Sequence, residues 1–205
     1  MQAIIKLACT AQCILDYVRK NFDFVGAALL RLYLVPVFWV AGQNKWNPFD
    51  SDSSLDGVIG WFDSMGMPFP TLNAYLAWGA EYLGAVLLAL GLATRWACIP
   101  LMFTMIVAAT TVHWDNGWQA VHDANSPHAS ATVGEAIERL DRAKSILREH
   151  GNYGWLTEHG GFLVSNNGIE WAATYFVLLL ALFFIGGGRF ISLDYWIGCC
   201  RRRLY

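Results

Sequence analysis

The chain has 205 residues, of which 56% are hydrophobic and 15% are charged, and its formal net charge is −2. A soluble domain usually carries about 25% charged residues, so much of this surface is expected to face something other than water. The charge balance gives no indication of a nucleic-acid partner. Composition therefore favours an integral membrane protein.

Four stretches are apolar enough, and nearly long enough, to cross the ~30 Å of a bilayer's hydrocarbon core, which takes about 20 helical residues. They cover residues 24–42, 72–92, 96–113 and 169–186. The predicted fold class is therefore all-α: an integral membrane four-helix bundle in which residues 1–205 form a single membrane domain. The segment up to Lys20 is predicted to be an interfacial helix.

Lysine and arginine predict the orientation of the spans, because these residues are enriched at cytoplasmic ends. The side shared by both termini and the second connection carries the larger set: Lys6, Arg19, Lys20, Arg95, Arg189, Arg201, Arg202 and Arg203. We therefore expect a multi-pass protein of the bacterial inner (cytoplasmic) membrane with both termini in the cytoplasm. The long connections, 43–71 and 114–168, then lie outside, and the second offers a surface for a partner protein.

Both long connections are predicted to contain short helices. In the first, Leu55, Val58, Ile59 and Phe62 are spaced as one apolar helix face. In the second, Thr132 and Glu135 have the spacing of a capping box, and Gly151 is a helix stop.

A carboxylate interrupts the second span, in the sequence "WGAEYLGAVLLALGLATR". An ionisable residue in a span usually faces the protein interior or a water-filled cavity, so Glu81 is expected to point into the bundle. A rise of ~1.5 Å per residue places Arg31 of the first span at a similar depth. We therefore expect an Arg31–Glu81 interaction, direct or through a tyrosine or water. Two interpretations stay open: a pair that only fixes helix register, or a protonatable element of a polar pocket.

A second polar cluster is expected where the spans end at the outer face. His113 ends the third span, Lys45 follows the first, and Glu170 lies at the start of the fourth. Nearby tryptophans also fit an interfacial aromatic belt. The candidate catalytic residues are Glu81, Arg31 and His113, and the candidate cofactor-binding residues are Lys45, Trp78, Tyr82 and Glu170.

Histidines and aspartates in "HWDNGWQAVHDANSPH" are of the types that bind borderline metals. Their spacing matches no compact metal motif, so no metal site is predicted and copper ranks low as a cofactor. The chain also lacks a phosphate-binding loop and a dinucleotide fingerprint, which argues against a self-sufficient NAD enzyme.

Several fragments, taken in their order, resemble the DoxX family of small four-helix membrane proteins. They are "LLRLYLVPVFWVAGQNKW", "MGMPFP", "AEYLGAVLLALGLATR", the span ending in His113, and "GGGRFISLDYW". The resemblance implies that Arg31, Lys45, Glu81 and His113 occupy positions where the family carries polar residues in its bundle. One branch supplies the membrane subunit of thiosulfate:quinone oxidoreductases, others are linked to oxidative-stress complexes, and an HvfX-like branch accompanies maturation of copper-binding peptides. The insert 114–168 goes beyond the minimal family pattern.

Three functions are therefore considered. The first is a redox-linked membrane subunit that binds a quinone or a similar amphipathic molecule, because hydrogen bonds to quinone oxygens and a carboxylate for proton transfer suit such a site. If the protein is an enzyme, it is then an oxidoreductase acting with a partner. The alternatives are a non-catalytic assembly factor in copper-binding peptide maturation and a carrier for a small solute or lipid. Four spans are few for a carrier unless the chain forms a homo-oligomer.

Overall fold

The computed structural model describes the backbone of residues 1–204 and the side chains of residues 1, 5–7 and 9–200. The side chains of Arg201, Arg202 and Arg203, which counted toward the predicted orientation, lie outside the described residues. Within residues 1–204 the chain is helical, apart from turns, loops and one antiparallel bridge between Val121 and Ser165. The predicted all-α class is confirmed. The chain divides into two compact units, residues 1–104 with 177–205, and residues 105–176.

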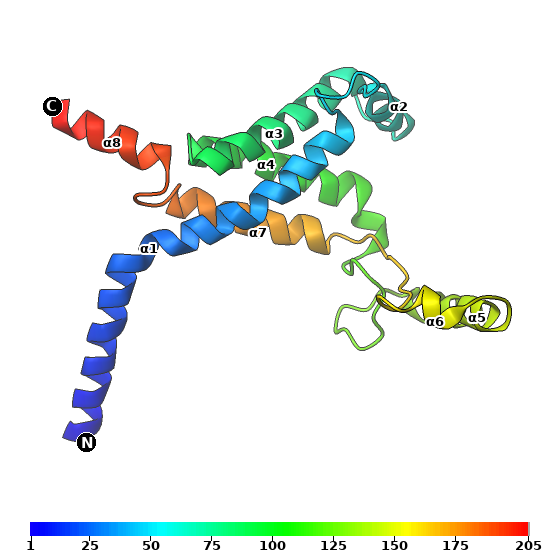
Figure 1. The fold of residues 1–205 in the computed structure, drawn as a ribbon, viewed down its shortest axis with the longest axis horizontal. Coiled ribbons are helices and arrows are strands. Elements are labelled where there is room, and N and C mark those ends of the chain that lie inside the picture. The colour runs from blue at the N-terminus through cyan, green and yellow to red at the C-terminus, as the bar shows by residue number, and fades with distance from the viewer. Residues whose placement is uncertain (205) are drawn as a thin grey trace. The chain divides into compact units, whose positions relative to one another are not determined.

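Four long apolar helices match the four predicted spans (Figure 1). They are α1 (Gln2–Lys45), α3 (Pro70–Leu90), α4 (Thr94–Val107) and α7 (Glu170–Ile185). A π-helical turn, η1 (Ala108–Val112), continues α4. By length and composition, the stretches Ile5–Lys45 and Thr94–Val112 can cross a membrane, and α7 is apolar but shorter.

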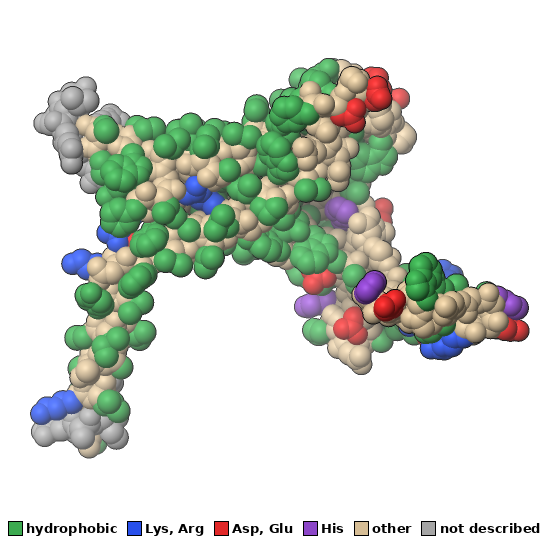
Figure 2. Space-filling model, in the orientation of Figure 1, with side chains coloured by type: hydrophobic (Ala, Val, Ile, Leu, Met, Phe, Trp, Pro, Cys, Tyr) green, Lys and Arg blue, Asp and Glu red, His purple; other side chains and the backbone are tan. Residues whose placement is uncertain are grey.

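Large apolar side chains are exposed along these helices, which is the reverse of a soluble protein. Leu32 of α1 is 70% exposed, Phe103 of α4 is 67% exposed and Phe184 of α7 is 71% exposed. Figure 2 shows hydrophobic side chains over the visible face of α1 and α3. A continuous apolar surface of this kind requires an apolar environment, so these faces are suited to lipid.

Helix α1 is bent at Phe22, whose φ of −117° and ψ of 17° are not helical (Figure 1). The part before the bend is helical, as the sequence predicts. The side chains that the structure describes in this part are exposed on all sides, among them Ile14, Leu15 and Val18. Its place at a membrane interface stays a prediction.

The core of the first unit is built where α1 packs against α3. Gly42 of α1 is buried against Tyr82 of α3, and a Cβ at Gly42 would lie 3.0 Å from the Tyr82 backbone. Gly84 of α3 makes a similar close approach to Leu101 of α4. Small residues in membrane helices let backbones come together in this way, which increases van der Waals contact.

The predicted helix in the first long connection is α2 (Asp56–Ser64). Its predicted apolar face is confirmed: Leu55 and Phe62 are buried with Ala74 of α3, and Val58 and Ile59 pack against them. This contact fixes the connection over the start of α3.

The second unit contains η2 (Trp114–Asn116), α5 (Val133–His150) and α6 (Tyr153–Leu156). Helix α5 has the predicted bounds, with Thr132 as N-cap and Gly151 as C-cap. The predicted capping box does not form, because the Thr132 side chain makes no capping hydrogen bond. The first unit also ends in a helix that was not predicted, α8 (Leu193–Leu204).

Candidate functional site

A partly buried ion pair links the C-terminal end of α1 to the middle of α3. The Lys45 ammonium donates a hydrogen bond to Glu81 Oε2 over an N–O distance of 2.5 Å. The Glu81 side chain is 4% exposed, whereas that of Lys45 is 22% exposed. Ala74 and Ala85 on the same side of α3 are fully buried. The prediction that Glu81 points into the protein is confirmed.

Aromatic rings of α1, of its C-cap Trp46 and of α3 pack on one another, and Trp46 and Tyr82 directly follow Lys45 and Glu81 in the chain. Tyr82 stacks on Trp39 with ring centroids 4.7 Å apart, and on Trp78 at 5.5 Å. Trp78 in turn packs on Trp46 at 4.6 Å, and its Nε1 donates a hydrogen bond to the Trp46 carbonyl oxygen at 2.9 Å. Lys45, Glu81, Trp78 and Tyr82 therefore form one cluster, which we call the Lys45–Glu81 site. Three of them were predicted as cofactor-binding residues and Glu81 as a catalytic residue.

The predicted Arg31–Glu81 interaction is wrong. The Arg31 guanidinium donates to four backbone carbonyl oxygens instead. Two belong to the last turn of α3, with Nε 2.6 Å from Leu88 O and Nη2 2.8 Å from Ala89 O. The others are Gly187 O at 2.8 Å and Ile191 O at 3.2 Å, both from Nη1.

The direction of helical side chains explains why Arg31 contacts the end of α3 and not Glu81. Each side chain leans toward the N-terminus of its own helix. Because α1 and α3 are antiparallel, Arg31 leans toward the C-terminal end of α3, and Glu81 leans toward Lys45. Leu88 is seven residues beyond Glu81, about 10 Å along the helix. An estimate of depth from the Cα positions alone therefore placed both side chains too close together.

Arg31 has a structural role in this arrangement. The last carbonyl groups of a helix lack partners within the helix, and a cation near them interacts favourably with the helix dipole. Arg31 satisfies two such groups in α3 and joins them to the loop before α8. A Cβ at Gly91, the C-cap of α3, would lie 2.6 Å from Arg31 Nη1. The Arg31 position accordingly fits a helix-end clamp better than a catalytic residue.

Asp194 belongs to the same junction and was not among the predicted residues. Its carboxylate accepts hydrogen bonds from Ala93 N at 2.7 Å and Thr94 N at 2.9 Å, at the start of α4. Its own N–H donates to Gly91 O at 3.0 Å. The only signal in the sequence was the fragment "GGGRFISLDYW". Asp194 therefore ties the turn between α3 and α4 to α8.

The two remaining predicted site residues lie in the second unit, where both hold loop backbone. His113 Nδ1 is 2.8 Å from Asn167 O, which also accepts a hydrogen bond from Asn116 Nδ2 at 3.0 Å. Glu170, the first residue of α7, accepts from Ala120 N at 2.8 Å. These contacts join the loop after η1 to the segment before α7.

Among the described residues, no three histidine, cysteine, aspartate or glutamate side chains are gathered as a metal-binding group. His122 Nδ1 lies 3.3 Å from Ser130 Oγ. No metal site is proposed from these residues.

Comparison with known proteins gives one family and two curated relatives. The DoxX family model matches residues 26–114. "Putative oxidoreductase CatD" of Bacillus subtilis (strain 168) is 34% identical over 93 residues, which cover 45% of this chain and 63% of that protein. "Inner membrane protein YphA" of Escherichia coli (strain K12) is 31% identical over 115 residues, which cover 53% of this chain and 76% of that protein. No solved structure gives a significant match.

The matched region covers part of the predicted site. It includes Arg31, Lys45, Glu81 and His113, and it ends before Glu170 and Asp194. This chain spans less than two thirds of the first relative's length.

The unequal burial of the ion pair predicts unequal effects on stability. Lys45→Met leaves a buried carboxylate without its cation and is expected to lower the free energy of unfolding by about 3 kcal/mol. Glu81→Gln leaves an ammonium that reaches the surface, and the expected loss is only about 1 kcal/mol. The double variant should be more stable than Lys45→Met alone. Reversible unfolding in detergent, followed by tryptophan fluorescence, measures all three.

The exposed pair Arg139–Glu135 in α5, with an N–O distance of 3.0 Å, is the matched control. Arg139→Met and Glu135→Gln should each cost less than about 0.5 kcal/mol. A larger loss for Glu81→Gln than for Lys45→Met, or additive effects of the two, would contradict the structure.

Proposed function

Because the chain belongs to the DoxX family of membrane proteins, we propose that it is a redox-linked membrane subunit that binds a quinone or a similar amphipathic molecule at the Lys45–Glu81 site. The observation that carries the proposal is an ion pair with a buried carboxylate, whose two residues are each followed in the chain by a packed aromatic ring. The relative at 34% identity, "Putative oxidoreductase CatD", carries a name that agrees with a redox role.

The chemistry of the site suits a molecule with polar oxygens on an apolar ring. The Lys45 ammonium can donate a hydrogen bond to a quinone oxygen, and the Glu81 carboxyl group can deliver or accept a proton. Tyr82 is stacked between Trp39 and Trp78, so an apolar stacking surface for a ligand comes from the tryptophans. Reduction of a quinone to a quinol consumes two electrons and two protons. In this proposal a partner oxidoreductase supplies the two electrons, and both protons are taken up from water at the exposed end of the site. Glu81 accepts one of these protons and passes it to a quinone oxygen, and the second reaches the other oxygen directly from water.

The partial exposure of Lys45 supports access to the site. Its side chain is 22% exposed beside the half-buried rings of Trp46 and Trp78. Nothing among the described residues favours the assembly-factor or carrier alternatives to the same degree.

Binding of a short-chain ubiquinone to the purified full chain tests the proposal. The ligand should quench tryptophan fluorescence, because Trp46 and Trp78 lie close to Lys45 and Glu81 in the chain. Glu81→Gln removes the carboxylate that orients the Lys45 ammonium, and it should weaken binding about tenfold, the value of one hydrogen bond to a charged group. Glu135→Gln, on the exposed face of α5, is the control and should bind as the wild type does. Unchanged affinity in folded Glu81→Gln, or no binding to the wild type, would refute the proposal.

We also propose that the chain lies in the inner membrane of a bacterium, with both termini in the cytoplasm. The support is the grouping of basic residues in the first unit: Arg189 contacts Asp23 and the Lys20 backbone, and Arg95 lies in the first turn of α4. A C-terminal green fluorescent protein fusion should fluoresce, and a C-terminal alkaline phosphatase fusion should be inactive. The reverse pattern would overturn this orientation.

A further inference from the structure

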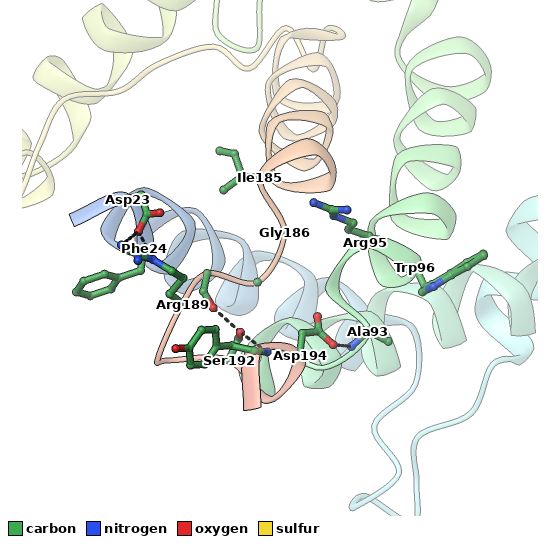
Figure 3. A pocket seen from close by; sticks show the side chains of 13 residues that line it. Asp23, Phe24, Ala93, Arg95, Trp96, Ile185, Gly186, Arg189, Ser192 and Asp194 are labelled. Atoms are coloured by element: carbon green, nitrogen blue, oxygen red, sulfur yellow. Dashed lines mark hydrogen bonds and ion pairs between the residues drawn. The ribbon is translucent and has the colours of Figure 1, made fainter. Parts of the chain in front are cut away.

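A cavity of about 570 Å³ lies at the end of the first unit remote from the Lys45–Glu81 site (Figure 3). Its walls come from the bend of α1, the start of α4 and the glycine-rich loop between α7 and α8. Polar side chains in the lining are Asp23, Arg95, Arg189, Ser192 and Asp194. We call it the loop cavity.

We propose that the loop cavity binds the phosphate of an anionic phospholipid headgroup. This site is separate from the proposed quinone site, because its residues surround the C-terminal end of α3 and not Glu81. Basic pockets between membrane helices near the cytoplasmic surface are suited to such headgroups.

The arginines of the cavity retain donors for a ligand. A guanidinium has five N–H groups. Among the described residues, Arg95 makes one hydrogen bond, from Nη2 to Phe184 O at 3.2 Å. Arg189 donates from Nε to Asp23 at 2.8 Å and from Nη2 to the Lys20 carbonyl. The Nη1 groups of both arginines therefore make no hydrogen bond within the described part of the chain, and two such groups can bind phosphate oxygens.

The two carboxylates that line the cavity, Asp23 and Asp194, already have partners within the protein. Asp194 uses both oxygens to accept the N–H groups of Ala93 and Thr94, and Asp23 is paired with Arg189. Within the described residues no carboxylate lies at ion-pair distance from Arg95, whose side chain points from α4 toward the end of α7 in Figure 3. The positive charge of Arg95 is thus the one that a phosphate would neutralise.

The surroundings of the cavity fit a lipid better than a soluble phosphate. Trp96 is 76% exposed, Ile185 is 51% exposed and Phe190 is 49% exposed. Trp96 and Ile185 also line the cavity. Apolar side chains next to exposed arginines match a molecule with acyl chains attached to its phosphate.

A simpler role for Arg95 is to cap α7, because a cation near a helix C-terminus is favourable. The 3.2 Å bond to Phe184 O serves that role. It uses one of five donors, so capping and lipid binding are compatible, and the two roles predict different effects of lipid charge.

Native mass spectrometry of the delipidated full chain tests the proposal with lipids of equal chain length. Dioctanoyl phosphatidylglycerol should bind about tenfold more tightly than dioctanoyl phosphatidylcholine. Arg95→Gln should remove that preference, and Arg142→Gln in α5 is the control that should retain it. Asp23→Asn removes the carboxylate paired with Arg189 and is expected to strengthen phosphatidylglycerol binding. This second variant tests the proposal even if Arg95→Gln folds poorly.

Three results would overturn the proposal: equal retention of the two lipids, unchanged preference in folded Arg95→Gln, or weaker phosphatidylglycerol binding in Asp23→Asn. Glycerol 3-phosphate at the same concentration identifies the source of the phosphate. It should not displace the lipid, and equal affinity for it would overturn the assignment to a phospholipid. Glu81→Gln should leave lipid binding unchanged, so failure of the quinone proposal is distinguishable from failure of this one.

Discussion

The hydrogen-bonded pair of Lys45 and Glu81 is the interaction on which the site depends. A carboxylate buried within an apolar helix is costly unless a cation accompanies it. Here the ammonium lies 2.5 Å away and still reaches the surface through its own side chain. The close approach of α1 and α3 at Gly42 and Tyr82 makes that distance available. The close packing of α1 on α3 and the Lys45–Glu81 ion pair therefore depend on each other.

The opposite end of α3 is held by a different kind of contact. Arg31 binds carbonyl groups and Asp194 binds N–H groups, so the backbone ends of two helices are satisfied by side chains of opposite charge. These contacts fix the register of α1 against α3 without Glu81. The two ends of α3 are therefore held by different partners: Arg31 contacts backbone groups, whereas Glu81 contacts the side chain of Lys45. The binding role proposed above concerns only the Lys45–Glu81 site.

The four long helices, α2 and α5 could be predicted because their signals are local, whereas α8 was not predicted. The length of the apolar segments predicted the four long helices. The spacing of apolar residues predicted α2, whose N-cap Leu55 and whose residue Phe62 are buried together. The partner of Glu81 could not be predicted from depth, because the tilt of side chains along antiparallel helices separates Arg31 from Glu81. Asp194 was missed because it caps a helix 100 residues earlier in the chain. Such contacts depend on tertiary structure and leave no periodic signal.

The central claim is that the Lys45–Glu81 site binds the headgroup of an amphipathic redox molecule. Photolabelling of the purified full chain with an azido-quinone, followed by peptide mapping, tests it most directly. We expect the label on peptides that contain Trp39 to Trp46 or Trp78 to Tyr82, and we expect unlabelled quinone to prevent it. Label confined to the loop cavity, or label that unlabelled quinone does not reduce, would contradict the account.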